Sequence, residues 1–141
     1  MRISVTVNGE LVRKGLQNLS AEIPQIGRQQ IRVVMDRIKR RMEEYPAERP
    51  GQRYKRTGKL FYSWGIDPIE NAGYMIKNTA RGKNGKMYGH YVVGDAYGTG
   101  QAWMHAGRWK LLRDVVDEEV ERLPDEIEER IVMVARREGL V

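Results

Sequence analysis

The chain has 141 residues and no cysteine, with 25 lysines and arginines against 19 aspartates and glutamates and a formal net charge of +6. Its length predicts one domain, residues 1–141, with a single modest hydrophobic core. The 40% hydrophobic and 31% charged residues exclude a disordered chain and a membrane-embedded protein, since a spanning helix needs about 20 consecutive apolar residues. The lack of cysteine excludes disulfide scaffolds, thiolate metal sites and cysteine nucleophiles.

Charge is distributed unevenly along the chain. Residues 1–109 contain 19 basic and 9 acidic side chains, a net charge of +10, whereas residues 110–141 contain 6 and 10, a net charge of −4. Such asymmetry is typical of a polyanion-binding surface, and equally of a protein whose unlike faces meet when copies stack on one another. Composition leaves both alternatives open.

The N-terminal segment alternates apolar and polar residues from Arg2 to Val7 and is followed by the turn signal Asn8-Gly9. This period of two predicts one strand. Because no apolar run follows the alternating residues, the segment does not resemble a secretory signal. We therefore expect the chain to remain in the cytoplasm after synthesis.

Two helical segments are predicted next. Residues 11–19 have helical spacing, but Gly15 weakens the pattern, which favours a short helix or an irregular turn. From Ser20, a candidate N-cap, a long amphipathic helix is predicted, with Pro24 in its first turn and Pro46 at its end. Its other side is basic, and its apolar residues are Ile31, Val34, Met35, Ile38, Met42 and Tyr45.

The middle of the chain is predicted to alternate loops and strands. Residues 46–59 contain two prolines, two glycines and five basic residues, a composition that predicts an exposed, mobile loop. A period of two predicts a hairpin from a strand beginning at Leu60 and a second strand at Tyr74–Asn78, and then a third strand at Met87–Val93. The glycine-rich residues 94–107 predict a second long surface loop.

Apolar residues at spacings of three and four from Leu112 to Val134 predict a C-terminal helix, with a kink or a restart near Leu123 because Pro124 lies inside it. The fold class that we expect is α+β, with an antiparallel sheet of three to five strands packed against a long N-terminal helix and a long, Pro-kinked C-terminal helix. The acidic residues of the last helix are assigned to its solvent-exposed face; they are Asp114, Asp117, Glu118, Glu119 and Glu121.

The sequence offers little for catalysis, and we expect no enzymatic activity, metal or cofactor. The only histidines are His90 and His105, and no catalytic or zinc-binding motif is present. A metal or nuclease site formed by these histidines with Asp67 and Asp95 is the less favoured alternative, because nothing in their spacing specifies convergence. Residues 94–100 lack the glycine pattern and the adjoining helix of a dinucleotide-binding loop.

Nucleic-acid binding has stronger support. Ten of the eleven aromatic residues lie between Tyr54 and Trp109, interleaved with lysines and arginines, a combination that single-strand binders use. Half of these aromatics alternate on predicted strands, where core packing also explains them. Nucleic-acid binding through residues 53–109 is therefore the alternative function.

Several short motifs follow one another in a characteristic order. A basic helix is followed by Arg56-Thr57-Gly58-Lys59-Leu60 with Ser63, then by a hairpin, by Asn78-Thr79-Ala80, Tyr88, Tyr91-Val92 and Gly94, and by a final helix. In this order the motifs resemble those of the tail-completion, or neck, proteins of tailed bacteriophages. The similarity extends over about residues 20–135. The chain departs from the family pattern at residues 81–86, which separate Ala80 from Tyr88, and at residues 101–105, where a Pro-Phe segment is usual.

The resemblance implies an α+β fold and a non-enzymatic structural role in the virion, at the interface between head and tail. It implies location in the tail or neck, assembly in the host cytoplasm, and neighbouring head-tail connector and tail proteins as partners. The opposed charges favour contact between unlike faces of neighbouring copies, as in a homo-oligomeric ring. A hexamer or a dodecamer is expected for such a ring, with no membrane contact, and its basic loops either contact genome DNA transiently or contact acidic neighbouring subunits. The candidate residues for subunit interfaces or for the channel wall are Arg53, Lys55, Arg56, Thr57, Lys59, Arg81, Lys83, Lys86, Tyr97, Trp103 and His105.

Overall fold

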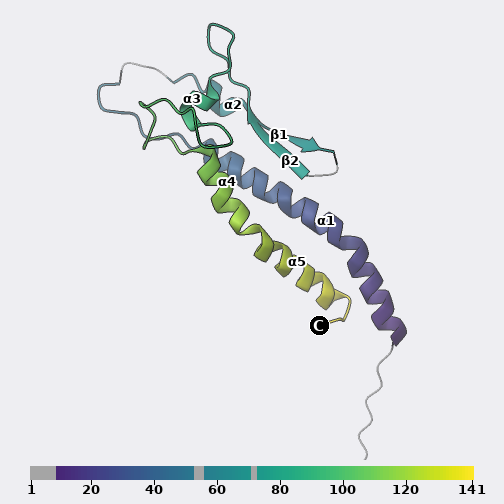
Figure 1. The fold of residues 1–141 in the computed structure, drawn as a ribbon. Helices are drawn as coiled ribbons and strands as arrows, with labels where there is room; N and C mark the ends of the chain where they lie inside the picture. Colours follow the sequence, from purple (N-terminus) through teal and green to yellow (C-terminus); the bar gives the residue numbers. More distant parts are fainter. Residues whose placement is uncertain (1–8, 53–55, 71–72) are drawn as a thin grey trace, which may run out of the picture. The chain divides into compact units, whose positions relative to one another are not determined.

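A computed structural model describes residues 9–52, 56–70 and 73–141 (Figure 1). Its elements in chain order are α1 (Gly9–Met42), α2 (Lys59–Tyr62), β1 (Trp64–Ile69), β2 (Gly73–Asn78), α3 (Gly89–Val93), α4 (Leu112–Glu121) and α5 (Leu123–Arg137). The expected α+β class with a long N-terminal helix is confirmed. None of the described helices has the length and apolar character needed to cross a membrane.

The chain groups into two compact units. The helical unit contains the residues up to Gln30 and residues 123–141, and the mixed unit contains Ile31–Arg122. Helix α1 therefore contributes its first part to the helical unit and its last part to the mixed unit. A single domain over the whole chain stays a prediction.

Helix α1 is longer than predicted, because Gly9–Met42 forms one continuous helix. Ser20 lies inside it, so the prediction of an N-cap there and of a separate segment before it was wrong. Gly15 does not end the helix: a methyl group added there would lie 3.2 Å from the carbonyl oxygen of Glu138 and from Leu140 Cδ2. Close packing within the helical unit thus outweighs the weak helix propensity of glycine.

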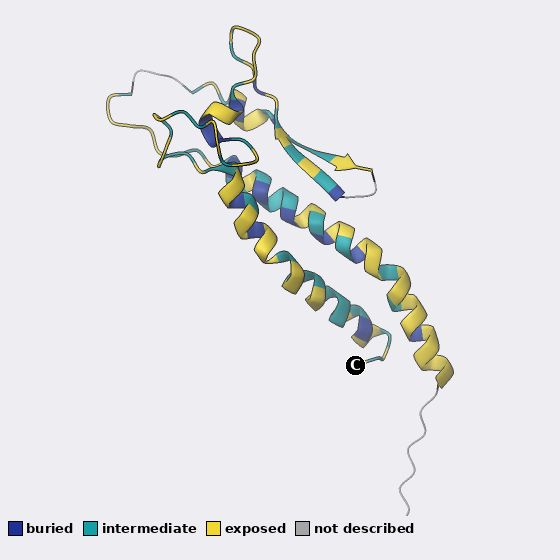
Figure 2. Cartoon of the chain, in the orientation of Figure 1, coloured by how far each residue is buried: buried dark blue, intermediate teal, exposed yellow. Residues whose placement is uncertain are grey.

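Polar contacts join α1 and α5 in the helical unit. Gln30 is buried, and its side chain donates a hydrogen bond to Glu126 at 2.5 Å. Arg130 donates to Gln29 at 2.7 Å, and Arg137 forms an ion pair with Glu22. Among the described residues of this unit, the buried hydrophobic side chains are Ile26 and Ala135 only, and Figure 2 shows the start of α1 as mostly exposed.

The interruption predicted in the C-terminal helix is confirmed. Helix α4 ends at Glu121 and α5 begins at Leu123, one residue before Pro124. Proline has no backbone N–H to donate to the preceding turn, so the helical hydrogen-bond ladder cannot run through it. The N–H of Arg122 instead donates to the carbonyl oxygen of Glu119 at 3.3 Å.

The hydrophobic core of the mixed unit confirms the apolar stripe of the first helix. Val34, Ile38 and Met42 are buried on α1, and the side chains buried with them come from later elements of the unit (Figure 2). Those side chains are Leu60, Trp64, Ala80, Val92, Val93 and Val115.

The sheet is a two-stranded antiparallel hairpin, in which Trp64 pairs with Asn78 and Ile69 with Gly73. The predicted hairpin is confirmed, but β1 begins at Trp64 and not at Leu60. The hairpin packs on α1, since the Arg32 guanidinium lies 5.4 Å from the centre of the Tyr74 ring. The strand predicted at residues 2–7 lies outside the described residues, so a sheet of three to five strands is not confirmed.

The third strand predicted at Met87–Val93 was wrong. Met87 forms one isolated bridge with Arg81, and Gly89–Val93 is the short helix α3. Val92 and Val93 are both buried although they are adjacent. Successive strand residues point to opposite faces, so a strand with one solvent-exposed face could not bury both, whereas a helical turn can.

The glycine-rich residues after α3 form a closed turn around Asp95. One carboxylate oxygen of Asp95 accepts hydrogen bonds from the N–H groups of Tyr97 and Thr99, each at 2.9 Å, and the other accepts from the Thr99 hydroxyl at 2.6 Å. Gly94 has φ +76° and lies so close to Leu111 that a methyl group would approach Cδ2 to 2.9 Å. Turn geometry and close packing therefore explain these glycines. The mobility of residues 46–59 and 94–107 stays a prediction.

Candidate functional site

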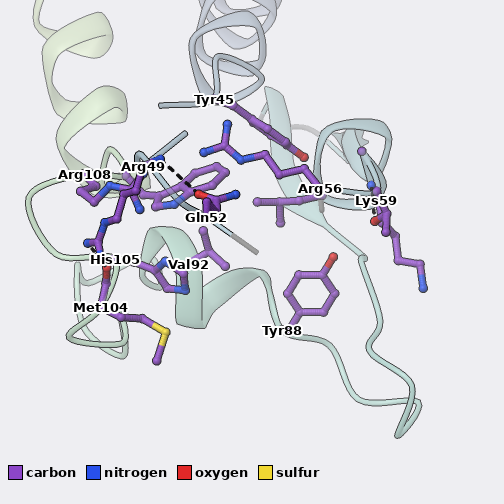
Figure 3. Close-up of a pocket in the computed structure, with 14 residues that line it drawn as sticks. Tyr45, Arg49, Gln52, Arg56, Lys59, Tyr88, Val92, Met104, His105 and Arg108 are labelled. Carbon is purple, nitrogen blue, oxygen red and sulfur yellow. Dashed lines mark hydrogen bonds between the residues drawn. The ribbon is translucent and has the colours of Figure 1, made fainter. Parts of the chain in front are cut away.

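A pocket of about 460 Å³ lies in the mixed unit, where the residues after α1 meet the residues before α4 (Figure 3). Four basic side chains surround it: Arg49, Arg56, Lys59 and Arg108. Its apolar wall includes Leu60, Val92, Met104 and Trp109, and Tyr45 and His105 also line it. We call this site the arginine pocket.

Backbone carbonyl groups hold its three arginines in place. Arg49 donates to the carbonyl oxygen of Met104 at 3.3 Å, and Arg108 donates to that of Ala47 at 2.8 Å. Arg56 donates to the carbonyl oxygen of Pro46 at 2.5 Å. Each bond fixes a guanidinium without neutralising its charge, and the first two join the loop after α1 to the loop before α4.

Arg56 is also fixed by two aromatic rings. Its guanidinium lies 5.4 Å from the centre of the Tyr45 ring and 5.5 Å from that of Trp109. The two rings pack edge to face, with centres 4.8 Å apart, and the Tyr45 hydroxyl accepts a hydrogen bond from the N–H of Phe61. A stacked guanidinium loses little further freedom when it binds a planar anion, so Arg56 is preorganised for such a ligand.

The pocket has an excess of positive charge. No aspartate or glutamate lines it, and within the described ranges Arg49, Arg56 and Arg108 form no ion pair with a carboxylate. Burial, followed by the nearby positive charges of Arg49 and Arg56, lowers the pKa of Arg108 below its ordinary value. Like charges held together in this way favour binding of an anion.

His105 contributes an unsatisfied polar atom to the same pocket. Its Nδ1 is buried and has no hydrogen-bond partner in the described part of the chain. Burial, and then the charges of Arg108 and Arg49, lower the pKa of His105. The neutral imidazole is therefore favoured next to the arginines, and it can accept or donate one further hydrogen bond.

Some of the predicted site residues meet here. Arg56, Thr57, Lys59 and His105 line the arginine pocket, although they come from two loops that the sequence places far apart. Lys59 also donates to the carbonyl oxygen of Arg81 at 3.2 Å.

The other predicted site residues lie elsewhere. Arg81, Lys83 and Lys86 are exposed on the turn of residues 81–86 and do not line the pocket, and neither do the exposed aromatics Tyr97 and Trp103. Arg53 and Lys55 lie outside the described residues.

Sequence reasoning missed Arg49 and Arg108. Arg49 belongs to the basic loop of residues 46–59, so its inclusion among the candidates required only that the whole loop be considered. Arg108 lies between His105 and Trp109 in sequence order, but the contact of this loop with the loop after α1 depends on the tertiary fold. No local pattern encodes such a contact.

The alternative metal site receives no support from the described residues. Among them, no group of three or more histidine, aspartate or glutamate side chains is arranged to hold a metal ion. His90 packs against the Tyr91 ring instead, with ring centres 4.0 Å apart.

Comparison of the chain with protein-family models, with curated proteins and with solved structures gives no match.

Proposed function

We propose that the protein is a structural subunit of a tailed-phage virion that completes or joins the tail at the head-tail interface, as a homo-oligomeric ring. The proposal starts from the motif resemblance over about residues 20–135. Its partners are further copies of the chain and the neighbouring connector and tail proteins.

The observation that carries the proposal is the amount of hydrophobic surface left exposed. Among the described residues, seventeen large hydrophobic side chains are exposed, against eleven hydrophobic residues that are buried. Three aromatic residues are more than four-fifths exposed: Tyr62 at 82%, Tyr97 at 81% and Trp103 at 84%. Single exposed aliphatic residues are ordinary in monomers, but tyrosine and tryptophan at this exposure are typical of side chains that anchor protein interfaces.

The two motifs behind the resemblance contact one another, which supports reading them as one structural feature. Asn78 donates from its amide to the carbonyl oxygen of Leu60 at 2.8 Å, and its Oδ1 accepts from the N–H of Ala80 at 3.0 Å. Gly89 packs so closely on Asn78 that a methyl group would lie 3.1 Å from Oδ1. One asparagine thus links the start of α2 to the segment that leads into α3.

We include in the proposal a sheet of three to five strands in the assembled ring. The outer edges of β1 and β2 form no further ladder among the described residues. Exposed edges of this kind accept additional strands, such as the one predicted at residues 2–7 or one from a neighbouring subunit.

The test is assembly of the purified full-length chain, alone and co-expressed with neighbouring connector and tail proteins, by mass photometry and negative-stain imaging. We expect rings or specific complexes, and a Trp103→Ser variant should shift them toward monomer at least tenfold because it removes an exposed anchor. Val141→Ser is the matched control, since Val141 is a hydrophobic residue of 76% exposure at the chain end. A chain that stays monomeric with every candidate partner would contradict the proposal.

The second candidate function is nucleic-acid binding, and the arginine pocket is the observation that favours it. Unneutralised guanidinium groups beside Tyr45 and Trp109 combine phosphate-binding charge with stacking surface. The salt dependence of oligonucleotide binding separates this function from the structural role.

A further inference from the structure

The helical unit carries a surface with the opposite character to the arginine pocket. Asp125, Glu128 and Glu129 are exposed on α5, and no described cation forms an ion pair with them. With Val132, Met133 and the basic Arg136 they line one shallow depression on α5, in which three carboxylates outnumber one guanidinium. We call the three carboxylates together with Val132 and Met133 the acidic face.

The spacing of the acidic face places its residues together. Residues three and four apart lie on one side of a helix, so the three carboxylates are followed one turn later by Val132 and Met133. Met133 is 66% exposed. The surface therefore combines negative charge with an apolar, flexible side chain that adapts its shape to a partner.

The arginine pocket has the complementary composition, with positive charge around an apolar wall. We propose that the acidic face of one copy of the chain docks on the arginine pocket of the next copy. Carboxylates of α5 accept hydrogen bonds from Arg49, Arg56 and Arg108, and Met133 packs against the apolar wall. The inference rests on the proposed ring function and specifies the contact that would build it.

The size of the pocket fits side chains better than a whole helix. Its volume of about 460 Å³ lies near the lower end of the range for small-ligand sites. An α-helix with its side chains is about 10 Å across, so α5 would stay outside the opening and insert carboxylate and thioether groups. Arginine binds carboxylates with two parallel hydrogen bonds, which fixes the orientation of the incoming side chain.

A second copy accounts for more of the observations than a free anion does. Phosphate would neutralise the pocket but would leave the acidic face unpartnered. Two-fold pairing through either surface would bring like charges together, which is repulsive. When one surface docks on the other in a head-to-tail arrangement, the contact is heterologous and propagates from copy to copy, and it gives a ring where the rotation between copies closes.

A charge swap tests the pairing. The pocket variant combines Arg49→Glu with Arg108→Glu, and the acidic-face variant combines Glu128→Arg with Glu129→Arg. Arg56 is left unchanged because it stacks on Tyr45 and Trp109. Each variant alone should assemble at least tenfold more weakly than the wild type, and a mixture of the two should restore assembly.

The mixture also makes a prediction about subunit number. Every favourable contact in the mixture joins one variant to the other. The two variants must therefore alternate around a restored ring, which then contains an even number of subunits. Native mass spectrometry of the mixture measures this directly. Matched controls carry the same charge changes elsewhere: Lys83→Glu with Lys86→Glu for the pocket variant, and Asp117→Arg with Glu121→Arg for the acidic-face variant. Thermal melts check that all four variants fold.

The outcomes separate the inference from the proposed function. If the wild type assembles and the mixture fails to restore assembly, or the variants never weaken it, the inference is overturned while the structural role stands. If the wild type stays monomeric with every candidate partner, both fail. If the pocket variant assembles normally but loses binding to inorganic phosphate or to a single-stranded oligonucleotide, the pocket is an anion site and the pairing is overturned.

Discussion

His105 shows how the arginine pocket changes the chemistry of a single residue. Its pKa is lowered by burial and by Arg108 and Arg49 from an ordinary value of about 6.5. The unfolded chain therefore takes up this proton more readily than the folded chain. Above the ordinary pKa His105 has no effect on the pH dependence of stability, and below it the folded state is progressively disfavoured. This loss of stability is complete once the pH has fallen below the lowered pKa of His105 in the folded state.

We accordingly expect the free energy of unfolding of the wild type to fall more steeply between pH 7.5 and pH 5.5 than that of a His105→Gln variant. Urea unfolding at several pH values in this range measures both slopes. Hydrogen bonds also lower the pKa of Asp95 and Glu138, through Thr99 and Asn18 respectively, but these carboxylates lose their contributions at more acidic pH and are common to both proteins. If the free energy of unfolding has the same pH dependence in the wild type and in His105→Gln, the lowered pKa of His105 is contradicted.

At the scale of elements, Glu119 joins α1 to α4. It is buried, and its carboxylate accepts hydrogen bonds from Arg37 at 2.8 Å and Arg41 at 3.1 Å. Arg41 also pairs with Glu118, whose side chain is 61% exposed, against 6% for Glu119. We expect Glu119→Ala to lower the free energy of unfolding by about 2–4 kcal/mol, because two partly buried arginines lose their shared carboxylate. The matched Glu118→Ala variant should lose less than about 1 kcal/mol.

Thermal or urea unfolding of the two variants in parallel provides the comparison. If both variants lose the same free energy of unfolding, the buried Glu119 contributes no more to stability than the exposed Glu118. The sequence pattern predicts Glu119 on a solvent-exposed face, and this prediction was wrong, because Glu119 is buried. The apolar spacing of α4 predicts burial at Val116 and Val120, whereas Val115 and Glu119 are the buried residues and Val120 is exposed.

The elements that the sequence predicts correctly have long or chemically decisive patterns. The stripe through Val34, Ile38 and Met42 repeats over several turns, and the break near Pro124 follows from a missing N–H group. Predictions for short segments fail because the strand period of two residues and the helix period of 3.6 residues fit them equally well, as in α3. Arg56 and His105 were recognised as candidates from their local surroundings. Arg49 and Arg108 were not, because the pocket forms only when two distant loops meet.

At the scale of the whole molecule, the net charge of +6 bears on the alternative function. A basic protein without dedicated nucleic-acid contacts binds DNA weakly, and the binding disappears at higher salt because the release of counterions from DNA then gains less free energy. We expect binding of a single-stranded oligonucleotide at about 50 mM salt that is lost by about 200 mM, measured by fluorescence anisotropy. Tight binding at physiological salt, with a salt-dependence slope reduced by Arg49→Glu and Arg108→Glu, would favour nucleic-acid binding through the arginine pocket as the primary function.

The three tryptophans lie in three different surroundings. Trp64 is buried in the core of the mixed unit, Trp109 is half-buried beneath the Arg56 guanidinium, and Trp103 is almost fully exposed. An indole in water emits at longer wavelengths than one in an apolar interior, and a soluble quencher such as iodide reaches only accessible rings. Intrinsic emission can therefore follow unfolding of the core, occupation of the arginine pocket and covering of Trp103 as distinguishable optical signals, without an attached dye.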